Sequence, residues 1–320
     1  NAGKMVTIDC GEGITLTSEN ETPFHLVLPP AVYHTFKITV VSTDGRIFIK
    51  EGKKPLVVSR SVAVKSGAFT PQELEYVDLS VDGTANSYIV SEAGMYSIDA
   101  SVMGNGTLGG YLHTEEISIT PASVEILWND SKNPSLVVAV YDQGSKTIKF
   151  LATGEEGNAL IAAKDGDGNV LWSWHIWCTD VPAIHKYVNS IGTFEVMDRN
   201  LGAIRGDRGV DNEWKESCGL EYQWGRKDPF AGGYLDQLDD LYGSVEESIL
   251  NPTFIYGKWQ GSEQYWHPDF KTLYDPCPVG YRVAPYQIWN GFSLEKVSGE
   301  FDNGWNFQYD SEGNTAWYPN

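Results

Sequence analysis

Residues 158–177, "NALIAAKDGDGNVLWSWHIW", constrain the fold more than any other stretch of this chain. Two apolar runs flank the turn-forming residues 165–169, which is the pattern of a β-hairpin. Side chains alternate between the two faces of a strand. One face of the second strand is wholly apolar and carries Trp172, Trp174, Ile176 and Cys178. We expect this face to lie in a core.

The opposite face of the same strand is mixed, with Ser173, His175, Trp177 and Thr179. His175 has no second histidine or carboxylate nearby at metal-ligand spacing, so the sequence favours a hydrogen-bonded sheet histidine over a ligand. The turn "DGDGN" resembles the first half of a calcium loop. Such a loop needs glycine at its sixth position and an acid at its twelfth, where this chain has Val170 and Ile176. A plain turn is therefore the better interpretation.

The length and charge of the chain limit its organisation and its partners. A chain of 320 residues exceeds what one core usually holds, which predicts two or three domains. A formal net charge of -20 argues against a nucleic-acid partner and against docking on anionic lipid. No apolar run reaches eighteen residues, so we expect no membrane span. The beginning of the chain suggests a mature or trimmed form.

We expect a mainly β protein in three parts. Residues 1–76 are predicted to be β, with a hairpin around Asp44-Gly45 in 36–50, a further strand over 56–65 and a linker over 66–77. Residues 77–180 are predicted to form a second β domain that ends with the Trp-rich hairpin. Its other expected strands are two in 87–107 and three short runs, "SVEILW", "LVVAVYD" and "TIKFLA".

Residues 181–320 differ in character, because periodicity fades and glycine, aspartate and aromatic residues crowd into irregular stretches. We expect a loop-rich α+β domain with a short helix in 284–294. An acidic stretch between Lys227 and Lys258 is either a solvated face or a calcium site with oxygen ligands. Calcium is the one cofactor that the sequence suggests, and the sequence does not identify which residues would bind it. Its acids are Asp228, Asp236, Asp239, Asp240, Glu246 and Glu247.

The cysteines and the usual catalytic motifs give little indication of chemistry. Cys10, Cys178, Cys218 and Cys277 form no CxxC pair, and their spacing disfavours zinc. The sequence leaves open whether these cysteines form disulfides, for which three pairings are possible, or are buried free thiols. The chain contains no phosphate-binding loop, no HExxH and no GxSxG elbow. Cys178 and His175 would point to opposite faces of one strand. The sequence therefore favours a non-enzymatic binding or structural protein.

Three motifs in the last part carry a family resemblance: "MDRNLGA" at 197–203, "GLEYQWGRKDPF" at 219–230 and "DPCPVGYRV" at 275–283. Together, in this order, they resemble the Fibrobacter succinogenes major paralogous domain, found in surface and secreted proteins of Bacteroidetes-like bacteria. The resemblance covers about residues 181–320. It leads us to expect a C-type-lectin-like fold and a family domain that continues beyond Asn320.

The first two parts resemble fimbrillin-like proteins of gut Bacteroidales. Residues 77–180 look like the β unit that precedes the paralogous domain, and 1–76, with "PFHLVLPP" and "FKITVVSTDGRIFIK", resemble the C-terminal half of a transthyretin-like fimbrillin sandwich. The resemblance implies an extracellular adhesion or fimbrial subunit, accessory or at the tip. Its implied partners are other surface subunits, through an open sheet edge and strand exchange, and a host or dietary glycan or protein.

Alternatives of other classes are a carbohydrate-binding module or component of a carbohydrate-active enzyme, and a structural outer-membrane lipoprotein. The motifs of the last part supply the ligand-contact candidates, each weighed against a scaffold role: Trp224, Arg226, Asp228, Asp198 and Arg199. An arginine flanked by carboxylates usually makes a structural ion pair. Four further tryptophans are candidates for stacking on a sugar, unranked: Trp259, Trp266, Trp305 and Trp317.

Overall fold

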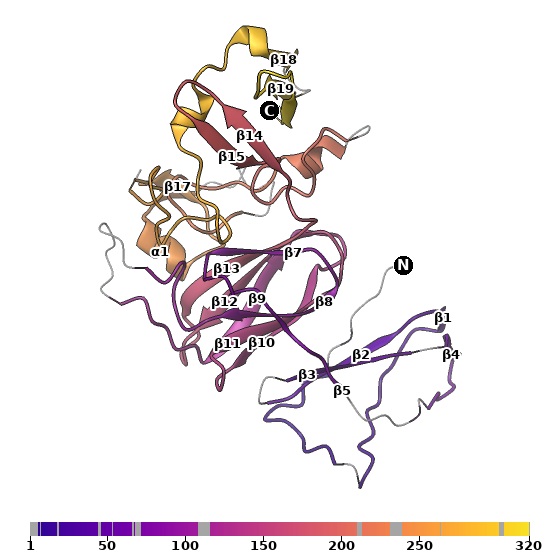
Figure 1. Ribbon diagram of the computed structural model, residues 1–320. Coiled ribbons are helices and arrows are strands. Elements are labelled where there is room, and N and C mark those ends of the chain that lie inside the picture. The colour runs from indigo at the N-terminus through magenta and orange to yellow at the C-terminus, as the bar shows by residue number, and fades with distance from the viewer. Residues whose placement is uncertain are drawn as a thin grey trace.

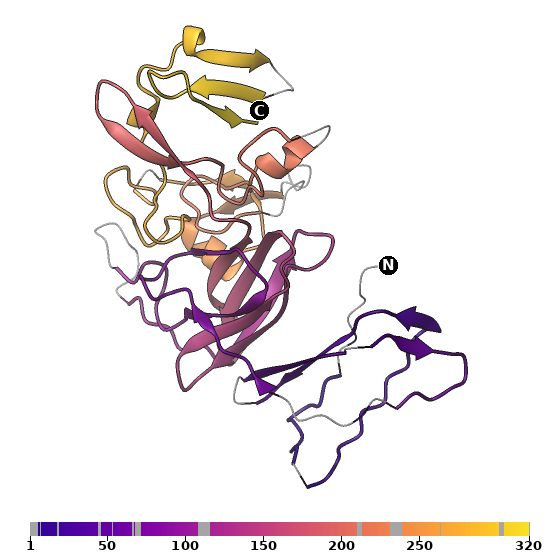
Figure 2. The ribbon, with the colours of Figure 1, turned by 45° about the vertical axis from the view of Figure 1, so that its right-hand side comes forward.

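The computed structural model describes residues 6, 8–17, 19–43, 46–52, 54–65, 67, 72–107, 116–209, 213–230, 239–262, 264–300 and 304–319. The chain is mainly β, as predicted. Its N-terminal strands and its last three strands lie at opposite ends of the molecule, with a pair of larger sheets between them (Figure 1, Figure 2). None of the described helices is long and apolar enough to cross a membrane.

The N-terminal part forms two small sheets. β1 (Ala31–Tyr33) pairs with β4 (Leu56–Val58), and β2 (Lys37–Val41) pairs with β3 (Ile47–Glu51), which also meets β5 (Gln72–Glu73). The strands of the predicted hairpin are confirmed, whereas its turn at Asp44-Gly45 lies outside the described residues.

Two predictions for this part need correction. The strand predicted over 56–65 ends at Val58, because the chain turns: Ser61 has a left-handed φ of 58° and the Val62 amide donates to Ser59. The predicted linker over 66–77 includes β5, and its last residue begins β6 (Val77–Asp78). This segment therefore contributes a strand to each of two sheets.

The middle part consists of two four-stranded sheets. The first has the order β10-β11-β8-β6 and the second the order β7-β13-β12-β9. The remaining bounds are β7 Ser87–Val90, β8 Gly94–Asp99, β9 Ser123–Asn129, β10 Leu136–Asp142, β11 Thr147–Ala152, β12 Gly157–Lys164 and β13 Val170–Cys178. All the strands predicted here are present. β7 and β8, although consecutive, belong to different sheets.

The core lies between these two sheets. Ile98, Ile148 and Phe150 from the first sheet and Trp172 and Trp174 from the second are completely buried in one cluster. The predicted hairpin pairs in register, for example Ile161 with Trp174. The apolar face of β13 is therefore inside, as the alternation predicted. Burial of its aromatic side chains supplies a large share of the hydrophobic driving force.

The opposite face of β13 is also buried, which the sequence did not predict. Ser173, His175 and Trp177 have exposures of 1% or less. The covering layer comes from residues after 198: Trp177 Nε1 donates to the carbonyl of Ala203 at 3.0 Å, and Lys227 Nζ donates to Ser173 Oγ at 2.6 Å. Helix α1 (Val245–Leu250) also contacts β13 (Figure 1). The second sheet thus has core on both faces, and contacts run continuously across position 180.

The C-terminal part is built from short elements joined by long loops. Its strands are β14 (Ile184–Val188), β15 (Thr193–Met197), β16 (Asp239–Gly243), β17 (Tyr256–Trp259), β18 (Val297–Glu300), β19 (Gly304–Gln308) and β20 (Thr315–Tyr318). In the described residues, 3₁₀ turns span Glu213–Ser217, Tyr286–Trp289 and Leu294–Lys296. The helix expected in 284–294 is therefore the single 3₁₀ turn at Tyr286–Trp289. Ser244 caps the N-terminus of α1 in a capping box completed by Glu247.

An aromatic cluster joins the β14-β15 hairpin to the three-stranded sheet β18-β19-β20. Tyr187 is 1% exposed and stacks on Tyr309, with ring centroids 5.2 Å apart. Trp289 and Phe292 pack against it from the loop that precedes β18. This cluster fixes the position of the last sheet, whose outer face is described below.

Candidate functional site

Two of the predicted site residues, Asp228 and Arg226, flank a lysine beneath the Trp-rich strand. Lys227 Nζ lies 2.7 Å from each carboxylate oxygen of Asp228, 2.6 Å from Ser173 Oγ and 3.0 Å from the Ser173 carbonyl oxygen. The ammonium also sits 4.4 Å from the ring centroid of Trp172. Burial lowers the pKa of Lys227 to about 8, while the charge of Asp228 opposes that shift. The pair locks the last part of the chain onto β13.

Arg226 holds the loop that follows α1. Its guanidinium donates to the carbonyls of Phe254 at 2.7 Å and Pro252 at 2.6 Å and lies 4.3 Å from the ring centroid of Phe230. Burial lowers the pKa of Arg226 to about 10. With exposures of 0% and 1%, Arg226 and Asp228 offer a surface ligand no contact, and their role is that of a scaffold.

Arg199 and Asp198 form a second structural cluster, at the end of β15. Arg199 donates to Asp198 Oδ1 at 2.8 Å, to Asp180 Oδ1 at 2.6 Å and to the Ile204 carbonyl at 2.8 Å. Hydrogen bonding to Arg199 lowers the pKa of Asp180. The predicted ion pair of arginine with its flanking carboxylate is confirmed. It ties the 198–204 loop to the end of β13.

His175 is a hydrogen-bonded sheet histidine, as predicted. Its Nε2 lies 2.8 Å from Asn158 Oδ1 and its Nδ1 lies 3.2 Å from Ser87 Oγ. Burial lowers the pKa of His175 to about 3, so the ring is neutral at physiological pH. Its role is to cross-link three neighbouring strands of one sheet.

The structure also bears on the predicted alternatives of a calcium site and of disulfide bonds. Asp228 is engaged by Lys227, Glu247 caps α1, Asp236 lies outside the described residues, and the side chains of Asp239 and Asp240 are not described. Within the described ranges, no three His, Cys, Asp or Glu side chains gather to hold a metal ion. The four cysteines, all within those ranges, form no disulfide.

Trp224 is the predicted site residue whose side chain reaches the surface, with 51% exposure. Its ring meets Trp266 edge to face, with centroids 5.1 Å apart, and Trp266 meets Tyr222 in the same way. The next residue, Gly225, has a φ of +88°, and an added Cβ would lie 3.0 Å from the Tyr265 ring. A side chain at position 225 would therefore be strained and would crowd Tyr265, and ligand contact at Trp224 stays a prediction.

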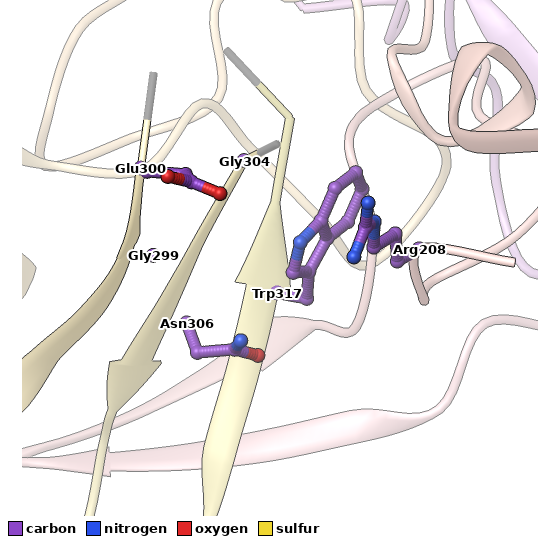
Figure 3. A pocket seen from close by; sticks show the side chains of 6 residues that line it. All are labelled: Arg208, Gly299, Glu300, Gly304, Asn306 and Trp317. Carbon is purple, nitrogen blue, oxygen red and sulfur yellow. The ribbon is translucent and has the colours of Figure 1, made fainter. Parts of the chain in front are cut away.

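A separate groove lies over the outer face of the last sheet. It has a volume of about 310 Å³ and is lined by Arg208, Gly299, Glu300, Gly304, Asn306 and Trp317. Figure 3 shows Arg208, from the loop after β15, beside the indole of Trp317, with Asn306 below and Glu300 across the sheet. The groove thus combines a cation, a carboxylate, an amide and an aromatic edge. Of the candidate sites, this groove presents the widest range of chemical groups to a ligand.

Sequence reasoning found one of these residues, Trp317, and could not rank it. The sequence did not predict Arg208, Glu300 or Asn306 as site residues, because the loop that carries Arg208 meets the last sheet only in the folded chain. The alternation in "GWNFQ", residues 304–308, is the local signal that identifies Asn306 as facing away from Trp305 and Phe307.

Comparisons with protein-family models, curated proteins and solved structures return no match for this chain. The family resemblance of the motifs stays a prediction.

Proposed function

We propose that the chain is a non-enzymatic subunit of an extracellular surface assembly, an adhesion or fimbrial component that contacts neighbouring subunits through its N-terminal strands. The resemblance of residues 1–180 to fimbrillin-like proteins supports this role and an extracellular location at the cell surface. That resemblance also supports a partial transthyretin-like sandwich at 1–76, and the three motifs between 197 and 283 support a paralogous-type domain at 181–320 with a C-type-lectin-like fold.

The observation that carries the proposal is the exposure of apolar strand residues in the N-terminal part. Val32 and Val57 are cross-strand partners in the two-stranded sheet β1-β4, yet they are 50% and 56% exposed. Val27, just before that sheet, is 97% exposed. A two-stranded sheet of three-residue strands is too small to be stable in isolation. An added strand would cover these valines and pair with an edge of β1 or β4.

A non-enzymatic role is supported by how the shifted ionisable groups are used. Lys227, Arg226 and Arg199 all bond to groups of the protein itself, and His175 is buried and neutral. In the described residues, each of these groups stabilises a loop or a strand. This arrangement favours a rigid scaffold that presents surfaces for binding.

A site-specific photo-crosslinking experiment tests the assembly role. A photoreactive side chain replaces Val57 in cells that produce the full chain, and mass spectrometry identifies the joined segment. We expect an adduct with a β-strand of another surface subunit. The matched control carries the same group at Glu312, an exposed turn position at the far end of the molecule. Equal adducts at both positions, or none at Val57, would refute the proposal.

A second candidate function is a carbohydrate-binding module or a component of a carbohydrate-active enzyme at the outer surface. The groove with Trp317, Asn306 and Glu300 favours it, because sugar sites pair an aromatic wall with a few polar groups. An immobilised glycan panel probed with the purified chain tests this function, and absence of binding to every glycan would count against it.

A further inference from the structure

We propose that the groove lined by Arg208, Glu300, Asn306 and Trp317 binds one unit of a neutral, hydroxyl-rich saccharide. The inference rests on the adhesive part of the proposed function and deepens it by naming the site and the ligand class. Its test does not involve the N-terminal strands, so the saccharide site and the assembly role can fail separately.

The strand register places the polar groups on one face of the last sheet. Ser298 pairs with Asn306, and Asn306 pairs with Trp317, so these three side chains form a row across β18, β19 and β20. Glu300 lies two residues from Ser298 and shares that face. The other face carries residues such as Phe307, which packs against Trp289 in the aromatic cluster. The sheet is thus apolar inside and polar outside, with one tryptophan among the polar groups.

A glycine lets that tryptophan lie flat against the sheet. Gly304 has a φ of +74°, and a Cβ there would lie 2.4 Å from Trp317 Cζ2. The indole consequently rests over the backbone of β19, next to Arg208 in Figure 3. Trp317 is 8% exposed, so it offers a rigid apolar edge rather than an open stacking platform. A rigid wall of this kind costs little conformational entropy when a ligand binds.

The charges of the groove select against ionic ligands. An anion attracted by Arg208 would meet the carboxylate of Glu300, and a cation attracted by Glu300 would meet the guanidinium. A neutral polyol suits both groups, because each hydroxyl donates one hydrogen bond and accepts others. Its hydroxyls can donate to Glu300 and accept from Arg208 and from the Asn306 amide, while its C–H groups contact the exposed edge of the Trp317 indole.

The size of the groove also fits a single sugar unit. Its volume of about 310 Å³ is at the lower end of the range typical of small-molecule pockets. A longer oligosaccharide would therefore place one residue in the groove and extend over the surrounding surface.

Titration of the purified full chain with cellotriose, mannotriose and trigalacturonate, followed by calorimetry, tests the proposal. We expect at least one of the two neutral trisaccharides to bind, and to bind at least about fivefold more tightly than the anionic one, because Glu300 repels a uronate. Trigalacturonate binding more tightly than both neutral sugars would overturn the ligand class. Binding of none of the three would overturn the site.

Variants then locate the binding. Glu300→Gln and Asn306→Ala should each weaken binding of the neutral trisaccharide about tenfold, since the first replaces a charged acceptor by a weaker neutral one and the second removes the amide that donates to the ligand. The matched control Glu312→Gln removes a carboxylate outside the groove and should leave the affinity within about twofold of wild type. Unchanged binding in both groove variants would overturn the proposal, and near-ultraviolet circular dichroism checks that each variant keeps the native packing.

Discussion

Replacing Lys227 by methionine should destabilise the protein strongly. The substitution keeps a long apolar stem over Trp172 but removes all four short contacts that Nζ makes with Asp228 and Ser173. Asp228, which is 1% exposed, then keeps the hydrogen bond from the Ser173 hydroxyl but loses the ammonium that neutralises its charge. Removing one partner of a buried ion pair costs about 3–5 kcal/mol, because the other charge stays buried and uncompensated.

Urea unfolding followed by tryptophan fluorescence measures this loss. With a denaturant slope of about 2 kcal/mol/M, a loss of 3 kcal/mol moves the midpoint down by about 1.5 M. The reporter is suitable because the ring of Trp172 lies 4.4 Å from the Lys227 ammonium, and Trp172, Trp174 and Trp177 are all buried.

The double variant Lys227→Met with Asp228→Leu separates the two causes of destabilisation. If the cost arises from an unpaired buried charge, removing both charges should recover most of the stability lost in Lys227→Met. A double variant as unstable as the single one would show that packing, and not the charge, dominates. A Lys227→Met variant as stable as wild type would refute the conclusion that this pair locks residues after 198 onto β13.

Three further predictions follow from the same geometry. Burial lowers the pKa of His175 from 6.5 to about 3, so between these two pH values the unfolded chain binds a proton that the folded chain does not. The free energy of unfolding should therefore fall by up to about 1.4 kcal/mol per pH unit as the pH drops below 6.5. In acid unfolding, the His175→Gln variant should show a shallower dependence of stability on pH than wild type. Cys10 is exposed and should react quickly with a thiol reagent in the native protein. Burial raises the pKa of Cys178 to about 11, so this thiol should react only after unfolding. Mass spectrometry of the labelled protein checks this, and rapid labelling of Cys178 in the native state would contradict its burial. Gly304→Ala should cost about 1–3 kcal/mol in thermal or urea unfolding and displace Trp317, seen as a change in near-ultraviolet circular dichroism; a neutral effect would mean that the close approach is not maintained.

The short-range patterns of the sequence were sufficient for most strands of the middle part. Alternation over 123–152 and the turn residues at 165–169 predicted strands that the structure contains, because period-two alternation and turn chemistry are local properties. The apolar face of β13 was likewise predictable as core. The N-terminal strand over 56–65 was overestimated, because the turn at Ser59–Val62 has no glycine or proline to mark it.

The candidate sites were less predictable than the strands. Arg226 and Asp228 lie in a specific motif, but their burial depends on β13 and on the loop after α1, which are remote in sequence. The groove depends on Arg208 meeting Asn306, about a hundred residues later. Pattern reasoning identifies residue types and local faces, and it has no means of pairing such distant surfaces.

The sequence by itself determined that this protein is mainly β and that Trp172 and Trp174 face a core, since both follow from the alternation of side chains along a strand. Only the tertiary structure decided that the other face of β13 is equally buried. That face carries Ser173 and His175, whose polarity predicts solvent until distant partners satisfy their hydrogen bonds. A buried polar group is stable only with such partners, and their arrival depends on how the whole chain folds.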